Sequence, residues 1–136
     1  MNEALFIDGV SALGGTLTET QISQFAAYSA RLKEWNQKMN LTAITDDDGI
    51  SVKHFLDSIL PLYHLDIPEG SMVADIGTGA GFPGIPLKIL RPDLKVTLVD
   101  SRYISSELLD QFLEFRGQDV LLLYGTQILN NSSSLK

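Results

Sequence analysis

The segment VADIGTGAGFPGIPLKI, residues 73–89, constrains the fold of this chain more than any other stretch. Residues 73–76 are typical of a short strand, and residues 83–90, after the glycines, are typical of a short helix. A turn at 91–93 leads to residues 94–99, where alternating β-branched residues predict a second strand. A strand, a helix and a strand in this order form a βαβ unit, which requires parallel strands and a right-handed crossover. The sequence therefore predicts an α/β fold.

Two amphipathic helices are predicted before this unit. Thr18 and Gln21 have the spacing of a capping box, in which a hydroxyl and an amide bind each other's backbone N–H groups. We expect a helix over residues 19–38 and a second one over residues 51–64. Apolar residues recur at helical spacing in both. They are Ile22, Phe25, Ala26, Leu32, Trp35 and Met39 in the first, and Val52, Phe55, Leu56, Ile59, Leu60 and Tyr63 in the second.

The chain divides at DIPEG, residues 66–70, where turn-forming residues mark a change of pattern. After the βαβ unit, the apolar residues from Leu108 to Phe115 suggest another helix. The stretch DVLLLYG, residues 119–125, suggests another strand. The expected parts are an N-terminal helical segment over residues 1–68, a core over residues 69–125 and a disordered tail over residues 126–136.

Composition excludes several classes of protein. A length of 136 residues suits a single domain, and the absence of cysteine excludes disulfides and thiolate metal sites. His54 and His64 are too few for a metal cluster, and no apolar run reaches the length of a membrane span. The N-terminus lacks a signal-peptide pattern, so we expect a cytoplasmic protein. The net charge of −7 opposes non-specific binding to nucleic acid.

The glycine-rich turn matches two ligand-binding patterns. The stretch from Gly79 to Gly84 fits G-x-G-x-x-G, the fingerprint of dinucleotide-binding proteins. The stretch from Asp75 to Gly81 fits acid-x-G-x-G-x-G, the first motif of methyltransferases that use S-adenosylmethionine. Both kinds of protein place an acidic residue after the second strand to hold ribose hydroxyls, so Asp100 does not distinguish them. A third interpretation is a tight turn that serves packing alone.

The groups near the turn favour S-adenosylmethionine as the cofactor. A dinucleotide pyrophosphate needs backbone N–H donors at the helix start and no carboxylate nearby. Here Asp75 precedes the turn, and Pro83 and Pro86 each remove an N–H group. S-adenosylmethionine carries an ammonium and a sulfonium and has no phosphate, so a nearby carboxylate is favourable and the missing donors do no harm.

Four stretches together resemble one family closely. EWNQKMNLTAIT (34–45), KHFLDSI (53–59), VADIGTGAGFPGIPLKI and VTLVDS (96–101) are similar to ribosomal RNA small subunit methyltransferase G, once called glucose-inhibited division protein B. The combination is specific, because FPGIPLKI after the glycines is unusual among methyltransferases. The resemblance implies an N-terminal helical segment and a partial, Rossmann-like class I fold. It also implies S-adenosylmethionine-dependent methylation at N7 of a guanine in small-subunit (16S) ribosomal RNA.

The resemblance implies a cofactor site as well, but it identifies no catalytic residue. Its cofactor residues are Asp75, Gly77, Gly79, Gly81, Phe82 and Asp100, of which Asp100 would hold the ribose. Residues that match the N-terminal motifs of the family without a clear role are Asn36, Asn40, Thr42, His54 and Asp57. From its position alone, His54 is expected to be a partly buried helical residue bonded to a neighbour. Trp35 is expected to pack in the core.

The resemblance covers residues 5–101 and stops after Ser101. Family members continue with a basic segment and several more strands, whereas RYISSELLDQFLEF follows here. We expect a truncated product of a frameshift or an assembly error, with a natural variant as the alternative. Methyl transfer by such a chain is expected to be weak or absent, leaving a remnant that at most binds S-adenosylmethionine. The strand at 73–76 would then be an exposed sheet edge through which the chain self-associates.

Overall fold

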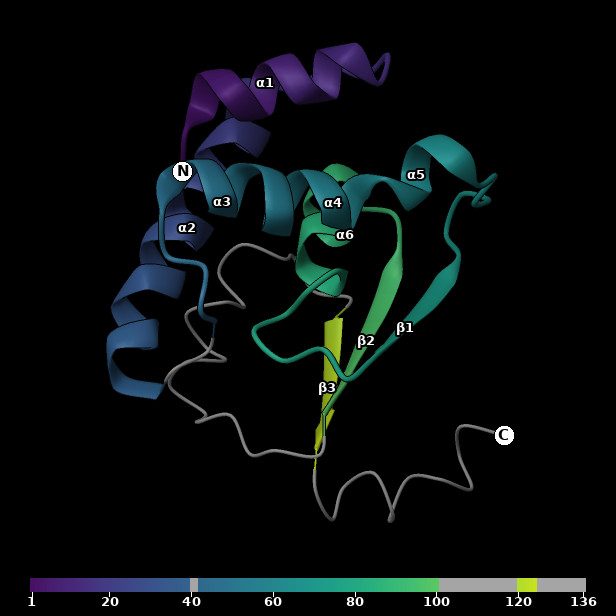
Figure 1. Ribbon diagram of the computed structural model, residues 1–136. Coiled ribbons are helices and arrows are strands. Elements are labelled where there is room, and N and C mark those ends of the chain that lie inside the picture. Colours follow the sequence, from purple (N-terminus) through teal and green to yellow (C-terminus); the bar gives the residue numbers. More distant parts are fainter. Residues whose placement is uncertain (40–41, 101–119, 125–136) are drawn as a thin grey trace.

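The computed structural model describes residues 1–39, 42–100 and 120–124. The part before the first strand is helical (Figure 1). Its elements are α1 Glu3–Ala12, α2 Glu19–Met39, α3 Asp47–Gly49, the π-helical segment η1 Ile50–Leu56, α4 Asp57–Ile59 and α5 Pro61–His64. None of the described helices is both long enough and apolar enough to cross a membrane.

Helix α2 begins with the predicted capping box. The Thr18 hydroxyl accepts from the Gln21 backbone N–H at 3.1 Å, and the Gln21 side-chain oxygen accepts from the Thr18 N–H at 3.0 Å. The box satisfies backbone donors that a helix start otherwise leaves unpaired. The helix ends at Met39, so the prediction of a helix over residues 19–38 is confirmed to within one residue.

Helix α1 is not among the predicted helices. Asn2 caps it, because its side-chain oxygen accepts from the Leu5 N–H at 3.1 Å. Glu3 adds a negative charge in the first turn, where the helix dipole favours one. Phe6 and Val10, four residues apart, are its buried residues. One cap and one apolar pair form a short pattern, which explains why periodicity alone did not reveal the helix.

The second predicted helix starts earlier than expected and changes its winding. It begins at Asp47, after Asp46 has capped its first turn with a carboxylate that accepts a backbone N–H at 2.8 Å. Residues 50–56 are π-helical, with hydrogen bonds from i to i+5 in place of i to i+4. This wider winding rotates side chains away from a 3.6-residue period. Val52 was predicted on the apolar face and is instead 40% exposed, whereas Phe55 is fully buried.

Three parallel strands form the described sheet: β1 Met72–Ile76, β2 Lys95–Asp100 and β3 Val120–Tyr124. Their order is β1-β2-β3, and Ala74, Thr97 and Leu121 are partners across it. Helix α6, Gly84–Leu90, connects β1 to β2 and confirms the predicted βαβ unit. Strand β3 confirms the strand predicted at 119–125. The helix predicted near 108–115 and the predicted tail lie outside the described residues.

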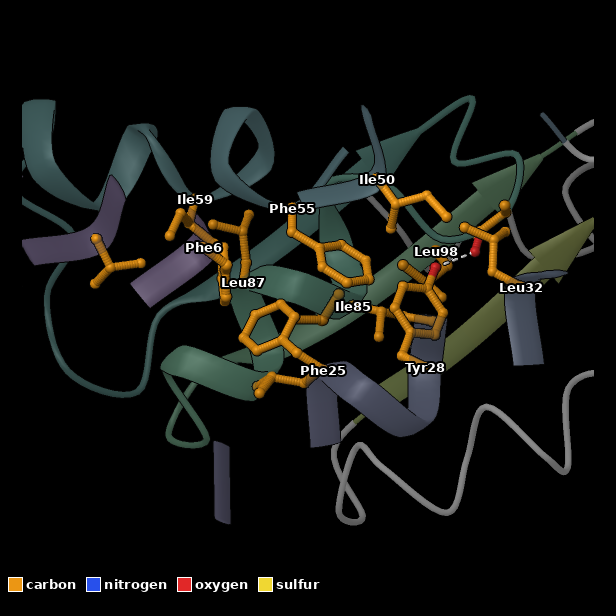
Figure 2. Close-up of a cluster of buried hydrophobic side chains, with 14 of the residues drawn as sticks. Phe6, Phe25, Tyr28, Leu32, Ile50, Phe55, Ile59, Ile85, Leu87 and Leu98 are labelled. Carbon is orange, nitrogen blue, oxygen red and sulfur yellow. Dashed lines mark hydrogen bonds between the residues drawn. The ribbon is translucent and has the colours of Figure 1, made fainter. Parts of the chain in front are cut away.

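Helix α6 lies between the sheet and the other helices (Figure 1), packing against β1 and β2 and against α2 and α4. A cluster of aromatic side chains fills the space beside it (Figure 2). Phe6 and Phe25 meet edge to face with ring centroids 4.7 Å apart, and Tyr28 stacks on Phe55 at 5.6 Å. Because Tyr28 comes from α2 and Phe55 from η1, this cluster fixes both elements next to the start of α6.

Lys88 fixes the other end of α6. Its side chain is buried, and its Nζ donates to the carbonyl oxygens of Pro92 and Leu94, each at 2.6 Å. Both carbonyls lie in the connection from α6 to β2. A buried ammonium is tolerated where acceptors compensate for lost water, so Lys88 acts as a polar clamp inside the βαβ unit.

Candidate functional site

The glycine turn, residues 77–83, joins β1 to α6 at the carboxyl end of the strands. Gly77, Gly79 and Gly81 have φ angles of 74°, 55° and 104°, a region that side chains disfavour. A Cβ atom at Gly77 or Gly79 would meet no heavy atom of the described residues within 4 Å. A Cβ atom at Gly81 would lie 2.9 Å from the Tyr28 hydroxyl oxygen. The turn therefore has an open side at Gly77 and Gly79 and a packed side at Gly81, against α2.

The end of β2 is attached to the open side of the turn. The N–H groups of Gly77 and Thr78 donate to the Val99 carbonyl oxygen at 2.7 and 3.0 Å. Asp100, the last residue of β2, is largely buried, and its Oδ2 accepts from the Gly79 N–H at 2.7 Å. The structure thus brings Asp100 to the glycines, as expected for the carboxyl ends of neighbouring parallel strands.

Asp75 braces the turn from within. Its side chain is 6% exposed, and its Oδ2 accepts from the Thr78 hydroxyl at 2.7 Å and from the Gly84 N–H at 2.9 Å. Burial raises the pKa of this carboxyl, the two hydrogen bonds oppose that rise, and the charge of Asp100 adds to it. The carboxyl group therefore joins the end of β1, the turn and the start of α6.

The backbone N–H groups at the start of α6 already donate hydrogen bonds within the chain. Asp75 accepts from Gly84, and the N–H groups of Ile85 and Leu87 donate to backbone carbonyls at 2.8 and 3.1 Å. Pro86 has no N–H group. A pyrophosphate here would find no donor and would face the buried Asp75 carboxyl. This geometry argues against the dinucleotide interpretation of the glycine pattern.

Phe82 connects the turn to the N-terminal helices. Its ring stacks on the His54 imidazole, with centroids 4.5 Å apart and planes within 4°, and it meets Tyr28 edge to face at 5.5 Å. The His54 Nε2 lies 2.8 Å from the Thr42 hydroxyl oxygen. Burial lowers the pKa of His54, which favours the neutral imidazole at pH 7. His54 is therefore partly buried and bonded to a neighbour, as predicted.

The other residues of the N-terminal motifs take different places. The Asn36 side-chain oxygen accepts from the Thr42 N–H at 2.7 Å and so orders the segment that holds His54. Trp35 is buried, which confirms its predicted role in packing. Asp57 is exposed at the start of α4, and Asn40 lies outside the described residues. In the described ranges, no three His, Cys, Asp or Glu residues are grouped so as to hold a metal ion.

Sequence patterns missed two residues that shape the turn. Tyr28 donates its hydroxyl to the Ala80 carbonyl oxygen (Figure 2), and Thr78 donates to Asp75. Tyr28 could have been found, because it lies three residues after Phe25 and therefore on the same helix face. A threonine between two glycines carries no comparable signal.

Comparison with known proteins decides the family. The family model described as rRNA small subunit methyltransferase G matches residues 21–117. The chain belongs to this family. The matched range includes the glycine turn, Asp100 and both N-terminal motifs, and it continues past Ser101. Membership agrees with the helices and the small parallel sheet, which form part of a Rossmann-like α/β methyltransferase fold.

Curated relatives named "Ribosomal RNA small subunit methyltransferase G" are similar to the chain. One from an Exiguobacterium species is 54% identical over 101 residues, which cover 74% of this chain and 42% of the relative. One from Acetivibrio thermocellus is 50% identical over 110 residues, which cover 81% and 45%. One from Staphylococcus aureus is 49% identical over 109 residues, which cover 79% and 46%. The chain thus spans less than half the length of these relatives.

Proposed function

We propose that the glycine turn binds S-adenosylmethionine as a methyl donor. The observation that carries this proposal is the open side at Gly77 and Gly79, next to the Asp100 carboxylate. Ligands of open α/β sheets bind outside the carboxyl ends of the strands, where this surface lies. A donor without phosphates needs no N–H group from α6, and carboxylates favour its positive charges.

Different residues of the site would make different contacts with the donor. When bound, S-adenosylmethionine would supply an activated methyl group. Asp100 would accept hydrogen bonds from the ribose hydroxyls, and Gly77 and Gly79 would let the backbone approach the donor closely. Phe82 would add an apolar contact. Asp75 would act from inside, by holding the shape of the turn through Thr78 and Gly84.

The proposed reaction is methylation of guanine N7 in small-subunit ribosomal RNA. The name of the relatives supports ribosomal RNA as the substrate, and the resemblance of the N-terminal and glycine motifs supports guanine N7. Guanine N7 carries an available lone pair, so the acceptor needs little general-base catalysis. The rate would then depend on holding donor and acceptor in line.

A second candidate function is donor binding without methyl transfer. The net charge of −7, with 10 basic residues in 136, supports it, because RNA phosphates need basic partners. Incubation of the chain with labelled donor and unmethylated small ribosomal subunits separates the two functions. Incorporation at N7 of a guanine would support the transferase, and donor binding without incorporation would support the second function.

Calorimetric titration tests the donor site itself. We expect S-adenosylmethionine to bind and nicotinamide dinucleotides not to bind. Asp100→Ala should weaken donor binding by roughly tenfold or more, because hydrogen bonds to a charged group are worth about 1.5–3 kcal/mol. Asp66→Ala, at an exposed aspartate away from the turn, is the matched control. Tight binding of a dinucleotide with none of S-adenosylmethionine would overturn the proposal.

We further propose an organisation for the chain. Residues 1–68 would form the helical segment, residues 69–125 the partial core and residues 126–136 a tail. Ribosomal subunits as partners would place the protein in the cytoplasm.

Strand β1 is proposed as a surface for self-association. Among the described strands it pairs with β2 alone, which leaves its other edge without a strand partner. Met72 and Ile76 are 85% and 74% exposed on it. Unpaired strand edges with apolar side chains recruit a second chain, so a second copy is the proposed occupant.

A further inference from the structure

We propose that a pocket between the N-terminal helices and the glycine turn receives the acceptor base, and that Asp57 recognises guanine there. The inference rests on the proposed methyl transfer and deepens it. The pocket has a volume of about 310 Å³ and is lined by Lys53, His54 and Asp57 from the helices and by Phe82 and Pro83 from the turn. This volume lies at the lower end of the range for small-ligand sites.

The position of the pocket suits an acceptor. Phe82 and Pro83 belong both to the pocket and to the turn that would hold the donor. Methyl transfer requires the accepting atom to lie about 3–3.5 Å from the methyl carbon and in line with the bond that breaks. A second pocket, which lies along α2 between Glu19 and Ala27, shares no residue with the turn. Of these two pockets, both lined by described residues, the one at Phe82 is suited to an acceptor.

A flat aromatic ring lines this pocket. The His54 imidazole is parallel to the Phe82 ring and is held by the Thr42 hydroxyl at 2.8 Å, so its orientation is fixed before any ligand arrives. Bases that have left a helical stack bind proteins by stacking on aromatic side chains. Such a surface accepts any base, so discrimination among bases must come from polar groups.

Asp57 supplies a polar group with the required chemistry. Asp57 and Lys53 are exposed, and the side chain of neither makes a hydrogen bond or ion pair with another residue in the described ranges. An ionised carboxylate only accepts hydrogen bonds, and guanine offers it two adjacent donors, N1–H and the 2-amino group. Adenine presents an acceptor at N1. Because N7 lies on the opposite edge of the purine, a base held in this way would keep N7 available to the donor.

Lys53 completes the proposed contact. It lies four residues before Asp57 on the same helical segment and lines the same pocket. Its ammonium would attract the phosphate of the bound nucleotide. The rival occupant is the amino-acid end of the donor, whose ammonium and carboxylate would suit Asp57 and Lys53 in turn.

Nucleotide titrations followed by NMR test the proposal with the chain as it stands. Guanosine 5′-monophosphate should bind more tightly than the adenosine nucleotide by about fivefold or more, as expected for a base read through two hydrogen bonds. Inosine 5′-monophosphate, which lacks the 2-amino group, should fall between them. Shifts should centre on residues 53–57 and Phe82. Equal binding of the three nucleotides, or shifts elsewhere, would overturn the proposal.

Variants identify the occupant. Asp57→Asn should abolish the preference for guanosine over adenosine and leave the affinity for S-adenosylhomocysteine unchanged. Asp66→Asn, at an exposed aspartate outside the pocket, should change neither. A loss of S-adenosylhomocysteine affinity in Asp57→Asn with nucleotide preference intact would assign the pocket to the donor and overturn the inference. Failure of the unmodified chain to bind S-adenosylhomocysteine would instead count against the proposed donor site. The nucleotide titration would still test the base pocket, because it requires no bound donor.

Discussion

The hydroxyl of Tyr28 donates a hydrogen bond to the carbonyl oxygen of Ala80, 52 residues further along the chain. Tyr28 belongs to α2, and Ala80 lies within the glycine turn. Burial, and then the nearby charge of Asp75, raise the pKa of Tyr28 well above 10, so the hydroxyl keeps its proton at physiological pH. The N-terminal helices therefore hold the backbone of the proposed donor site through a direct bond.

Tyr28→Phe should weaken binding of S-adenosylhomocysteine by roughly threefold to tenfold. The substitution keeps the ring that stacks on Phe55 and removes the hydroxyl that donates to Ala80. A buried carbonyl left without its partner costs about 1–3 kcal/mol, part of which should appear as a less well ordered turn. Calorimetric titration well below the unfolding temperature measures the affinity of fully folded protein.

The matched control for this variant is Tyr63→Phe. Tyr63 lies in the same helical part of the chain, with its hydroxyl beside Gly15 and away from the turn. Tyr63→Phe should leave the affinity for S-adenosylhomocysteine unchanged. If Tyr28→Phe lowers the unfolding temperature without changing the affinity, the hydroxyl serves stability alone and does not position the turn.

Asp75→Asn should change how stability depends on pH. Burial raises the pKa of Asp75 above its usual 3.8, so the folded chain holds this proton more tightly than the unfolded chain. The stabilisation that this proton gives to the folded chain is complete below the pKa that Asp75 has in the unfolded chain. It is lost as pH rises through the pKa that Asp75 has in the folded chain. The free energy of unfolding of the unmodified chain, relative to that of Asp75→Asn, should therefore fall as pH rises from about 4 to neutrality. Urea titrations across this range test it, and a difference that is independent of pH would contradict it.

Lys88→Met should reduce the free energy of unfolding by about 1–3 kcal/mol, because it removes the donor to two carbonyls inside the βαβ unit. Methionine has a similar length and fills the same buried space. Lys95→Met is the control, since Lys95 is exposed at the start of β2. Chemical denaturation gives the comparison, and equal stabilities of the two variants would show that the clamp contributes nothing.

Met72→Lys should reduce self-association of the chain. A charge on an edge strand opposes pairing with a second copy, and Met72 is the most exposed large apolar residue of β1. Sedimentation over a range of protein concentrations measures the effect. Leu65→Lys, at another exposed apolar residue outside the sheet, should leave the association as it is. A chain that is monomeric at all concentrations before substitution would refute self-association through β1.

The predicted βαβ unit agrees with the structure because its signals are local. Glycines and prolines mark its turns, and β-branched residues mark β2, so each boundary falls within about two residues of its predicted position. Helix α2 was predicted for the same reason, since the capping box and a long apolar face agree with each other.

The features that sequence patterns missed depend on contacts between distant segments. The π-helical winding of η1 leaves the residue types unchanged but alters which of them face inward, so Val52 was placed on the wrong face. The inward position of the Asp75 carboxyl depends on Thr78 and Gly84, and its motif does not show which way the side chain points. The stacking of His54 on Phe82 joins two stretches whose proximity no local pattern predicts.

The π-helical winding of η1 also determines whether the chain can tolerate the insertion or deletion of a residue in this segment. A π-helical turn is a wider turn inserted into an α-helix, and removing one residue would restore ordinary α-helical hydrogen bonds at little cost to the backbone. The same deletion would rotate later side chains by about 100° relative to earlier ones. A single codon within residues 50–56 would then decide whether His54 meets Phe82. Substitutions at the exposed Val52 should consequently be common among descendants of the gene, and one-residue insertions or deletions within residues 50–56 rare.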